Sequence, residues 1–309
     1  MEKEALIKKY YSDFDIESLQ FLNAGYDSEA YLVNDQFVFK FPRHHIAAGN
    51  LYKEAQVLLE IRDQLPIKVP EVKYLGQSQE TGQMEFVGYE RIMGEALTPE
   101  IIRVLSKETR AALAKEIADF FTALHSIKLR RPIEGLTINK KEKCLKEFGF
   151  IKSVVLPAVT EESKEKINTI YDSILGSKFS DTNCLVHNDF GASNVFFDIK
   201  TNKLCGIIDF GDIAVYDRDI DFVCLLQSQE EGFDQAFVDM VLSQYGYNDL
   251  ETLNKKNSFN EFYAQLENVF LGYSYEMNEL FEESLEALKK GISDYERQIV
   301  IEQNYRYYI

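Results

Sequence analysis

The tripeptide Asp-Phe-Gly occurs twice, at residues 189–191 and 209–211, and the segments between the copies strongly constrain the local fold. Two apolar runs, 195–197 and 204–208, flank the polar run 198–203. Apolar runs separated by a short polar run are typical of two antiparallel strands joined by a turn. The sequence therefore predicts a β-hairpin that ends in the second Asp-Phe-Gly.

The open end of this hairpin brings three polar side chains together. If Val195 lies opposite Ile208, Asn194 and Asp209 meet there, and Asp189 can face the same point from the loop that enters the first strand. One amide oxygen and one carboxylate suit Mg²⁺ beside nucleotide phosphates, and a second carboxylate can orient a substrate hydroxyl and take its proton. Each residue alone is more often a turn former, but the joint spacing favours a phosphoryl-transfer site.

The two triplets have different predicted roles. The second carries the metal ligand, Asp209, whereas Phe190 and Gly191 of the first are interpreted as loop residues without a role. His187 is predicted to be structural, with its ring bonded to the backbone. Asn188 stands where regulated protein kinases have Arg, and no Ala-Pro-Glu follows Asp209, which argues against protein kinase activity.

Lys40 and Glu54 form a predicted ion pair. Lys40 lies in the middle of an apolar strand, where a lysine is often only a solvated edge residue. Glu54, however, shares one helical stripe with apolar residues at i+4, i+7 and i+11. A carboxylate on such a stripe needs a partner, and the pair would hold Lys40 on the α- and β-phosphates of a nucleotide.

The remaining nucleotide contacts are predicted from position. Gly25 and Ser28 lie between the first two strands, where backbone N–H groups can cover phosphates, although a single Gly is a weak motif. Arg91 and Ile92 belong to a short connector that would offer backbone groups to the base. The ring of Tyr89 would narrow the inner end of the base pocket.

The order of elements predicts an α+β fold of two lobes. Strands and one helix, capped by Asn50 and running to about Leu65, fill a small β-rich N-terminal lobe, residues 1–90. A hinge at 91–94 leads to a larger, mostly helical lobe, 95–309, with a helical insert at about 135–180. Helices are expected at about 107–127, 140–175, 233–245 and 258–302.

Composition excludes several classes of partner. The 309 residues carry a formal charge of −17, which repels nucleic acid and anionic lipid and attracts cations. No apolar run approaches the length of a membrane span, and the start resembles no signal peptide. The four cysteines form no C-x-x-C pair and are expected to be buried, reduced thiols. We therefore expect a soluble, cytoplasmic, monomeric protein.

Across nearly its whole length, the chain resembles the aminoglycoside phosphotransferases, in particular the 2''-aminoglycoside group, which has a protein-kinase-like fold. The resemblance rests on Leu185–Phe190, Gly206–Asp212 and Asp219–Phe222. It implies the roles given above for Asp189, Asn194, Asp209, Lys40 and Glu54. It also implies a GTP or ATP donor, with Tyr89 associated with GTP. Arg218, where the group usually has Pro, is a departure that puts the acceptor in doubt.

The acceptor side is predicted from the acidic run that begins at Asp209. Its acids, together with Glu267, are candidates to bind substrate ammonium groups, although each alone is more often a solvated surface residue. Tyr263 could stack on a sugar ring, although an aromatic residue in a helix is more often part of a core. The acidic candidates are Asp212, Glu230, Glu231 and Glu267.

The sequence as a whole predicts a kinase that phosphorylates an aminoglycoside hydroxyl, the 2'' hydroxyl by resemblance, and so confers resistance. Two alternatives stay open. One is a kinase of the same fold for a macrolide, choline or an amino alcohol. The other is a nucleotide-binding pseudokinase, against which the presence of all five residues Lys40, Glu54, Asp189, Asn194 and Asp209 argues.

Overall fold

The computed structural model describes residues 2–176, 183–228 and 232–290, and its chain divides into two compact units. The sheet unit comprises Met1–Thr137, Leu185–Ala214 and Ser228–Gly246. The helical unit comprises Ile138–Cys184, Val215–Gln227 and Tyr247–Ile309. Residues on both sides of the predicted hinge at 91–94 belong to the sheet unit, and the two-lobe boundaries remain a prediction.

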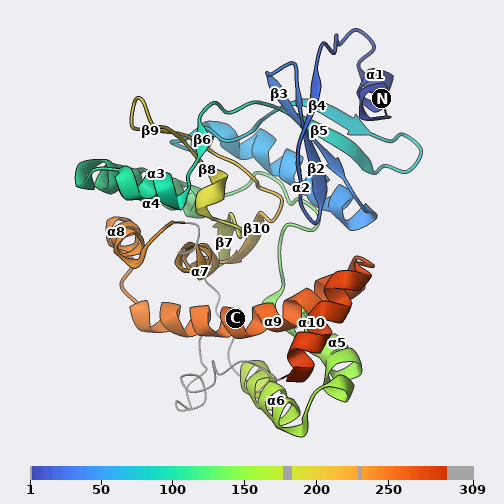
Figure 1. The fold of residues 1–309 in the computed structure, drawn as a ribbon, viewed down its shortest axis with the longest axis vertical. Coiled ribbons are helices and arrows are strands. Elements are labelled where there is room, and N and C mark those ends of the chain that lie inside the picture. Colours follow the sequence, from blue (N-terminus) through green and yellow to red (C-terminus); the bar gives the residue numbers. More distant parts are fainter. Residues whose placement is uncertain (1, 177–182, 229–231, 291–309) are drawn as a thin grey trace. The chain divides into compact units, whose positions relative to one another are not determined.

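The sheet unit is built on a five-stranded antiparallel sheet with the order β1-β2-β3-β5-β4 (Figure 1). Its hairpin β2–β3 turns at Asn34 and Asp35, whose φ angles of 54° and 55° fit a two-residue turn that Asn and Asp tolerate. The strands predicted for the N-terminal lobe are present. They are β1 (Leu19–Ala24), β2 (Ser28–Val33), β3 (Phe37–Pro42), β4 (Glu71–Gln77) and β5 (Met84–Glu90).

The two faces of this sheet have different chemistry because side chains alternate along each strand. Phe39, Phe41 and Phe86 form an aromatic core on one face, which Ile7 of helix α1 (Glu2–Tyr10) joins. Lys40 has the opposite parity to Phe39 and Phe41 and lies on the face that contacts helix α2. Helix α1 was not predicted from the sequence.

Helix α2 spans His45–Ile61, so the predicted cap at Asn50 is wrong. The N-cap is His44, whose ring Nδ1 accepts a hydrogen bond from the Ala47 amide at 3.1 Å. An imidazole can satisfy the first turn as a carboxamide does, and Asn50 therefore lies within the helix. The chain continues past Ile61 as a 3₁₀ turn, η1 (Arg62–Gln64).

The catalytic hairpin consists of β8 (Val195–Asp198) and β9 (Lys203–Ile207), and β6 (Glu95–Ala96) pairs with β8. Its predicted register is wrong by one residue, because Val195 lies opposite Ile207 rather than Ile208. A β-bulge between Phe196 and Phe197 changes the register by one residue within the hairpin, so the pairing beside the turn does not extend unchanged to Val195.

Helices α3 (Pro99–Val104), α4 (Lys107–Ser126) and α8 (Gln235–Tyr245) complete the sheet unit, and α4 packs against α8. Both α4 and α8 lie where the sequence predicts them. The short strands β7 (Asn183–Val186) and β10 (Ala214–Asp217) each span a boundary between the two units.

The helical unit contains five helices among the described residues, and its core combines apolar side chains from α5, α6, α9 and α10. The predicted helix 140–175 is two helices, interrupted at 151–160 by a π turn and a 3₁₀ turn that contains Pro157. The helices are α5 (Lys140–Phe150), α6 (Glu161–Gly176), α7 (Asp219–Gln227), α9 (Leu250–Ser274) and α10 (Asn278–Lys290).

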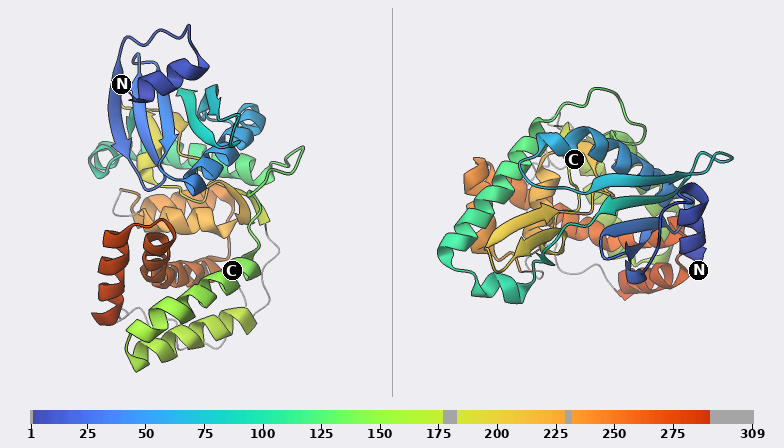
Figure 2. Two further views of the ribbon diagram at one scale, coloured as in Figure 1. Left: turned by 90° about the vertical axis from the view of Figure 1, so that its right-hand side faces the viewer. Right: turned by 90° about the horizontal axis from the view of Figure 1, so that it is seen from above.

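The predicted helix 258–302 is also two helices, α9 and α10, which lie side by side (Figure 2). The chain turns between them at Glu276, whose φ angle is 57°. Gly272 permits their close approach, because a Cβ there would lie 2.6 Å from the backbone nitrogen of Phe281. Residues 291–302 of that prediction lie outside the described residues.

Among the described residues, no helix is long and apolar enough to cross a membrane. The four cysteines all lie within the described residues and form no disulfide. Cys144 is buried, and burial raises the pKa of its thiol to about 12. The other three cysteines are half-buried rather than fully buried as predicted.

Candidate active site

Lys40 lies between two carboxylates in the sheet unit. Its Nζ is 3.2 Å from Oε1 of Glu54 and 2.8 Å from Oδ1 of Asp209. The predicted Lys40–Glu54 pair is therefore present, and Glu54 is only 1% exposed. Burial alone would lower the pKa of Lys40, but the two carboxylates outweigh it and raise that pKa, which keeps the ammonium charged.

The two carboxylates respond differently to this environment. Burial is the largest influence on Glu54 and raises its pKa, although Lys40 opposes the rise. For Asp209, the Lys40 charge is the largest influence and lowers the pKa, and the Asp209 side chain stays 46% exposed. Asp209 is therefore an ionised carboxylate that still reaches solvent, as a cation ligand must be.

Asp209 follows β9 in a left-handed backbone conformation with φ of 64°. Asp tolerates this region better than most residues, and the turn redirects the chain after the strand. The Ile208 amide donates to the Asn194 carbonyl at 2.9 Å, so Asn194 lies opposite Ile208 and Asp209 follows one residue later. Despite the corrected register, both residues lie at the open end of the hairpin.

His187 ties the catalytic loop to this hairpin. It is fully buried, and its Nε2 donates to the Ile208 carbonyl at 3.0 Å, one residue before Asp209. The predicted structural role of His187 is therefore confirmed. The interpretation of Phe190 as a loop residue without a role is wrong, because its ring is 1% exposed and lies 4.7 Å from the Phe121 ring centroid.

Asp189 is exposed, and its backbone is fixed by Asn194. The Asn194 Nδ2 donates to the Asp189 carbonyl at 2.9 Å. Since the amide nitrogen is engaged, the group of Asn194 that can bind a cation is its Oδ1. The carboxylate of Asp209 and the side-chain oxygen of Asn194 are hard oxygen donors, the kind that suits Mg²⁺ shared with phosphates.

Gly25 and Ser28 form the ends of a tight turn between β1 and β2. The Gly25 amide donates to the Ser28 carbonyl at 3.0 Å, which closes the turn. This turn, residues 25–28, is called the phosphate turn below, after the contact that the sequence predicts for it.

The connector after β5 contacts the rest of the sheet unit through both Arg91 and Ile92. The Arg91 amide donates to the Gln36 carbonyl at 2.8 Å, and its guanidinium pairs with Asp35. The N–H of Arg91 is therefore engaged, which limits its predicted contact with a base. Gly206 of β9 admits Ile92, because a Cβ there would lie 2.8 Å from the Ile92 side chain.

Tyr89 lies on the Lys40 face of the sheet, since it pairs with Val38 while Lys40 pairs with Val87. Its ring is 3% exposed. Burial raises the pKa of its phenol well above the usual value, and the Glu54 charge adds to this rise. The ring therefore borders the Lys40–Glu54 pair.

The acceptor candidates are divided between the units. Asp212 is exposed, and Asn188 donates to its carbonyl at 3.2 Å. Loss of hydration near the neighbouring protein raises the pKa of the Asp212 carboxyl, and the Lys53 charge partly offsets this rise. Glu230 and Glu231 lie outside the described residues.

Tyr263 is 6% exposed within the helical unit, and the Lys143 ammonium lies 4.8 Å from its ring centroid. A buried ring with a cation over it offers no open face to a sugar, so the predicted stacking role is wrong for this structure. Glu267 is half-buried and close enough to raise the pKa of Tyr263, although burial is the larger cause. Its predicted contact with a substrate ammonium group remains a prediction.

Sequence reasoning missed Lys53 and Asp27. Lys53 is 9% exposed, and its burial lowers its pKa, with Asp212 the largest opposing charge. Lys53 precedes Glu54 in the sequence but does not lie on the apolar stripe of the helix, so the helical pattern does not predict its burial. Asp27 stands within Gly25–Ser28, where an Asp is expected as a turn former.

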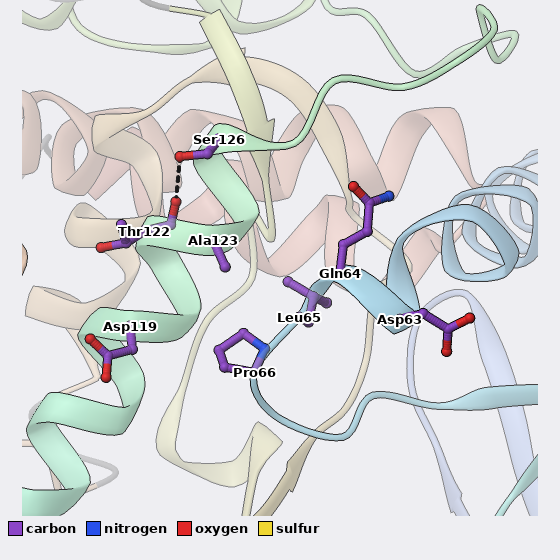
Figure 3. A pocket seen from close by; sticks show the side chains of 8 residues that line it. All are labelled: Asp63, Gln64, Leu65, Pro66, Asp119, Thr122, Ala123 and Ser126. Atoms are coloured by element: carbon purple, nitrogen blue, oxygen red, sulfur yellow. Dashed lines mark hydrogen bonds between the residues drawn. The ribbon is translucent and has the colours of Figure 1, made fainter.

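A separate hollow of about 520 Å³ lies between η1 and the last turns of α4 (Figure 3). Leu65 and Pro66 form one wall, and Asp119, Thr122 and Ser126 form the other. None of the predicted site residues lines it, so it is distinct from the Lys40 site.

The fold and this site define a kinase-like phosphotransferase. Residues 18–254 match the phosphotransferase enzyme family (APH), and the chain belongs to that family. The chain is similar to the gentamicin complex of APH(2")-IIa, with 31% identity over 93% of this chain and 95% of that chain and a TM-score of 0.80. The predicted family resemblance and kinase-like fold are thereby confirmed.

Two further solved structures carry nucleotides. The streptomycin–ATP ternary complex of APH(2")-IIa has 31% identity, covers 98% of both chains and has a TM-score of 0.79. The GDP and kanamycin complex of APH(2")-IIia has 26% identity over 94% of this chain and 97% of that chain, with a TM-score of 0.78.

Proposed function

We propose that this protein transfers the γ-phosphoryl group of GTP or ATP to a hydroxyl of an aminoglycoside, the 2'' hydroxyl by resemblance, and so confers resistance. The Lys40–Glu54–Asp209 cluster carries this proposal. A buried carboxylate holds a lysine whose ammonium also reaches an exposed, ionised carboxylate. Phosphoryl transfer needs such preorganised charge more than it needs covalent chemistry.

In the proposed reaction, Asp189 orients the acceptor hydroxyl and receives its proton. The acceptor oxygen then forms a bond to the γ-phosphorus, the bond to the β–γ bridging oxygen breaks, and the nucleoside diphosphate leaves. Asp209 and Oδ1 of Asn194 would hold Mg²⁺, which neutralises charge on the phosphate oxygens when bound. Lys40 would bind the α- and β-phosphates, and the phosphate turn would cover them.

Charge supports a cationic acceptor. The chain has a formal charge of −17, and Asp212 lies three residues after Asp209. The relatives of this chain include complexes with gentamicin, kanamycin and streptomycin, all of which carry amino or guanidino groups. An anionic site concentrates such cations and disfavours neutral acceptors.

A panel of acceptors with each nucleotide tests this function. We expect purified protein with Mg²⁺ to release nucleoside diphosphate when gentamicin- or kanamycin-type acceptors are added. We also expect it to prefer GTP, with which the resemblance associates a tyrosine at the Tyr89 position. Mass spectrometry of the product should show one added phosphate, and NMR should place it. Turnover with a macrolide or choline, and none with any aminoglycoside, would contradict the proposal.

Replacing Lys40 with Met should lower kcat/KM for the nucleotide about 100-fold, equivalent to about 3 kcal/mol. The change removes the ammonium that would bind the phosphates and leaves the buried Glu54 unpaired. The double variant Lys40→Met/Glu54→Gln removes that unpaired charge and should recover the fold but not the activity. Lys115→Met, an exposed lysine paired with Asp119, is the matched control.

A further inference from the structure

Three of the four carbonyl oxygens of the phosphate turn accept hydrogen bonds from protein groups. The guanidinium NH1 of Arg43 donates to the Gly25 carbonyl at 2.6 Å, and the Arg43 amide donates to the Asp27 carbonyl at 2.8 Å. The Ser28 carbonyl accepts from the Gly25 amide. With these three oxygens engaged, the N–H groups of Tyr26 and Asp27 are the groups of the turn that we infer to bind an anion.

The side chain of Asp27 contacts the N-terminal part of α2. Its Oδ2 accepts from Asn50 Nδ2 at 2.8 Å, and its Oδ1 lies 3.5 Å from Nε2 of His44. His44 uses its other ring nitrogen, Nδ1, to accept from the Ala47 amide, so Nε2 is the ring nitrogen that faces Asp27. Helix α2 has no acid in its own first turn, and Asp27 supplies a carboxylate near that end.

One face of helix α2 contacts both the phosphate turn and Lys40. Asn50 and Glu54 are four residues apart, so their side chains are neighbours on the helix surface. Asn50 bonds Asp27 of the phosphate turn, and Glu54 bonds Lys40. The position of the turn relative to Lys40 is therefore fixed through one turn of helix.

We propose that Asp27, with Asn50 and His44, is a positioning residue that fastens the phosphate turn to α2 and thereby sets the affinity for nucleotide phosphates. This inference rests on the proposed function, because it needs a nucleotide to bind beside Lys40. It assigns no proton transfer and no direct substrate contact to Asp27. It differs from a general role in stability because it predicts a change in nucleotide affinity with the acceptor site intact.

A second negative charge placed beside Asp27 tests this inference. Asn50→Asp places a second carboxylate against Asp27, and we expect the dissociation constant for GDP with Mg²⁺, measured by titration calorimetry, to rise about tenfold. KM for the acceptor should stay within about twofold. The reciprocal variant Asp27→Asn/Asn50→Asp restores one donor and one acceptor and should recover affinity to within about threefold. Asp13→Asn, an exposed acid in the same unit, is the control for lost charge and should bind as the parent does.

The outcomes separate the two proposals. If the parent protein binds neither GDP nor ADP, the proposed function is wrong. If the parent binds but Asn50→Asp binds equally well, only the positioning role is wrong. A reciprocal variant that regains the parent's unfolding midpoint but not its nucleotide affinity would also overturn the positioning role.

Discussion

Asp189→Asn should lower kcat by about 10³-fold, within the range of roughly 10² to 10⁴ that a positioned general base contributes. The isosteric amide keeps the size of the side chain but cannot take the acceptor's proton. Nucleotide affinity should be unchanged, because Lys40, Glu54 and Asp209 form their cluster without Asp189. Steady-state kinetics and a GDP titration measure the two quantities separately.

The control is Asp198→Asn, at the opposite end of the same hairpin. Asp198 accepts from the Lys200 amide at 2.9 Å and from the Thr201 hydroxyl at 2.7 Å, which stabilises the β8–β9 turn. Its replacement should leave kcat within about twofold of the parent value. Full activity of Asp189→Asn would exclude Asp189 as the proton acceptor.

Lys256→Met should destabilise the helical unit by about 3 kcal/mol, the lower end of the cost of breaking a buried ion pair. Lys256 is 8% exposed, and its Nζ lies 2.9 Å from Asp217 and 2.7 Å from Asp219. The cost stays at the lower end because Lys140 and Arg218 still pair with these carboxylates. Urea unfolding followed by circular dichroism measures the loss.

The neighbouring residue offers a matched control for this stability prediction. Lys255 also lies on α9, but its partner Glu251 is 77% exposed, and such surface pairs contribute about 0 to 1 kcal/mol. Lys255→Met should therefore change the unfolding free energy by less than about 1 kcal/mol. Equal effects of the two substitutions would contradict a stabilising role for the buried network.

Local pattern was sufficient where one strong physical rule applied. Glu54 on an apolar stripe required a cation, and Lys40 is its partner at 3.2 Å. The turn between β2 and β3 agrees with the tolerance of Asn and Asp for positive φ, at Asn34 and Asp35. Local pattern failed for the N-cap of α2 and for the register of the β8–β9 hairpin. His44 caps α2 in place of Asn50, and Val195 pairs with Ile207 rather than with Ile208.

The acceptor side shows a different limit. Acidic residues can be recognised in the sequence by their charge. Whether they can contact a substrate depends on the residues that pack around them. Tyr263 is buried under Lys143, which no spacing of residues indicates. Lys53 and Asp27 interact with residues distant in the sequence. The Asp212 charge acts on the pKa of Lys53, and Asn50 donates a hydrogen bond to Asp27.

The sequence by itself determined the doubled Asp-Phe-Gly, the roles expected for Asp189 and Asp209, and the α+β class, because these depend on short spacings and on alternation. Only the tertiary structure decided that Asp209 also pairs with Lys40 at 2.8 Å and that Phe190 is a core residue. It also decided that Asp27 accepts a hydrogen bond from Asn50 of α2. These contacts join segments up to 169 residues apart, and burial and charge pairing over such separations arise only when the chain packs.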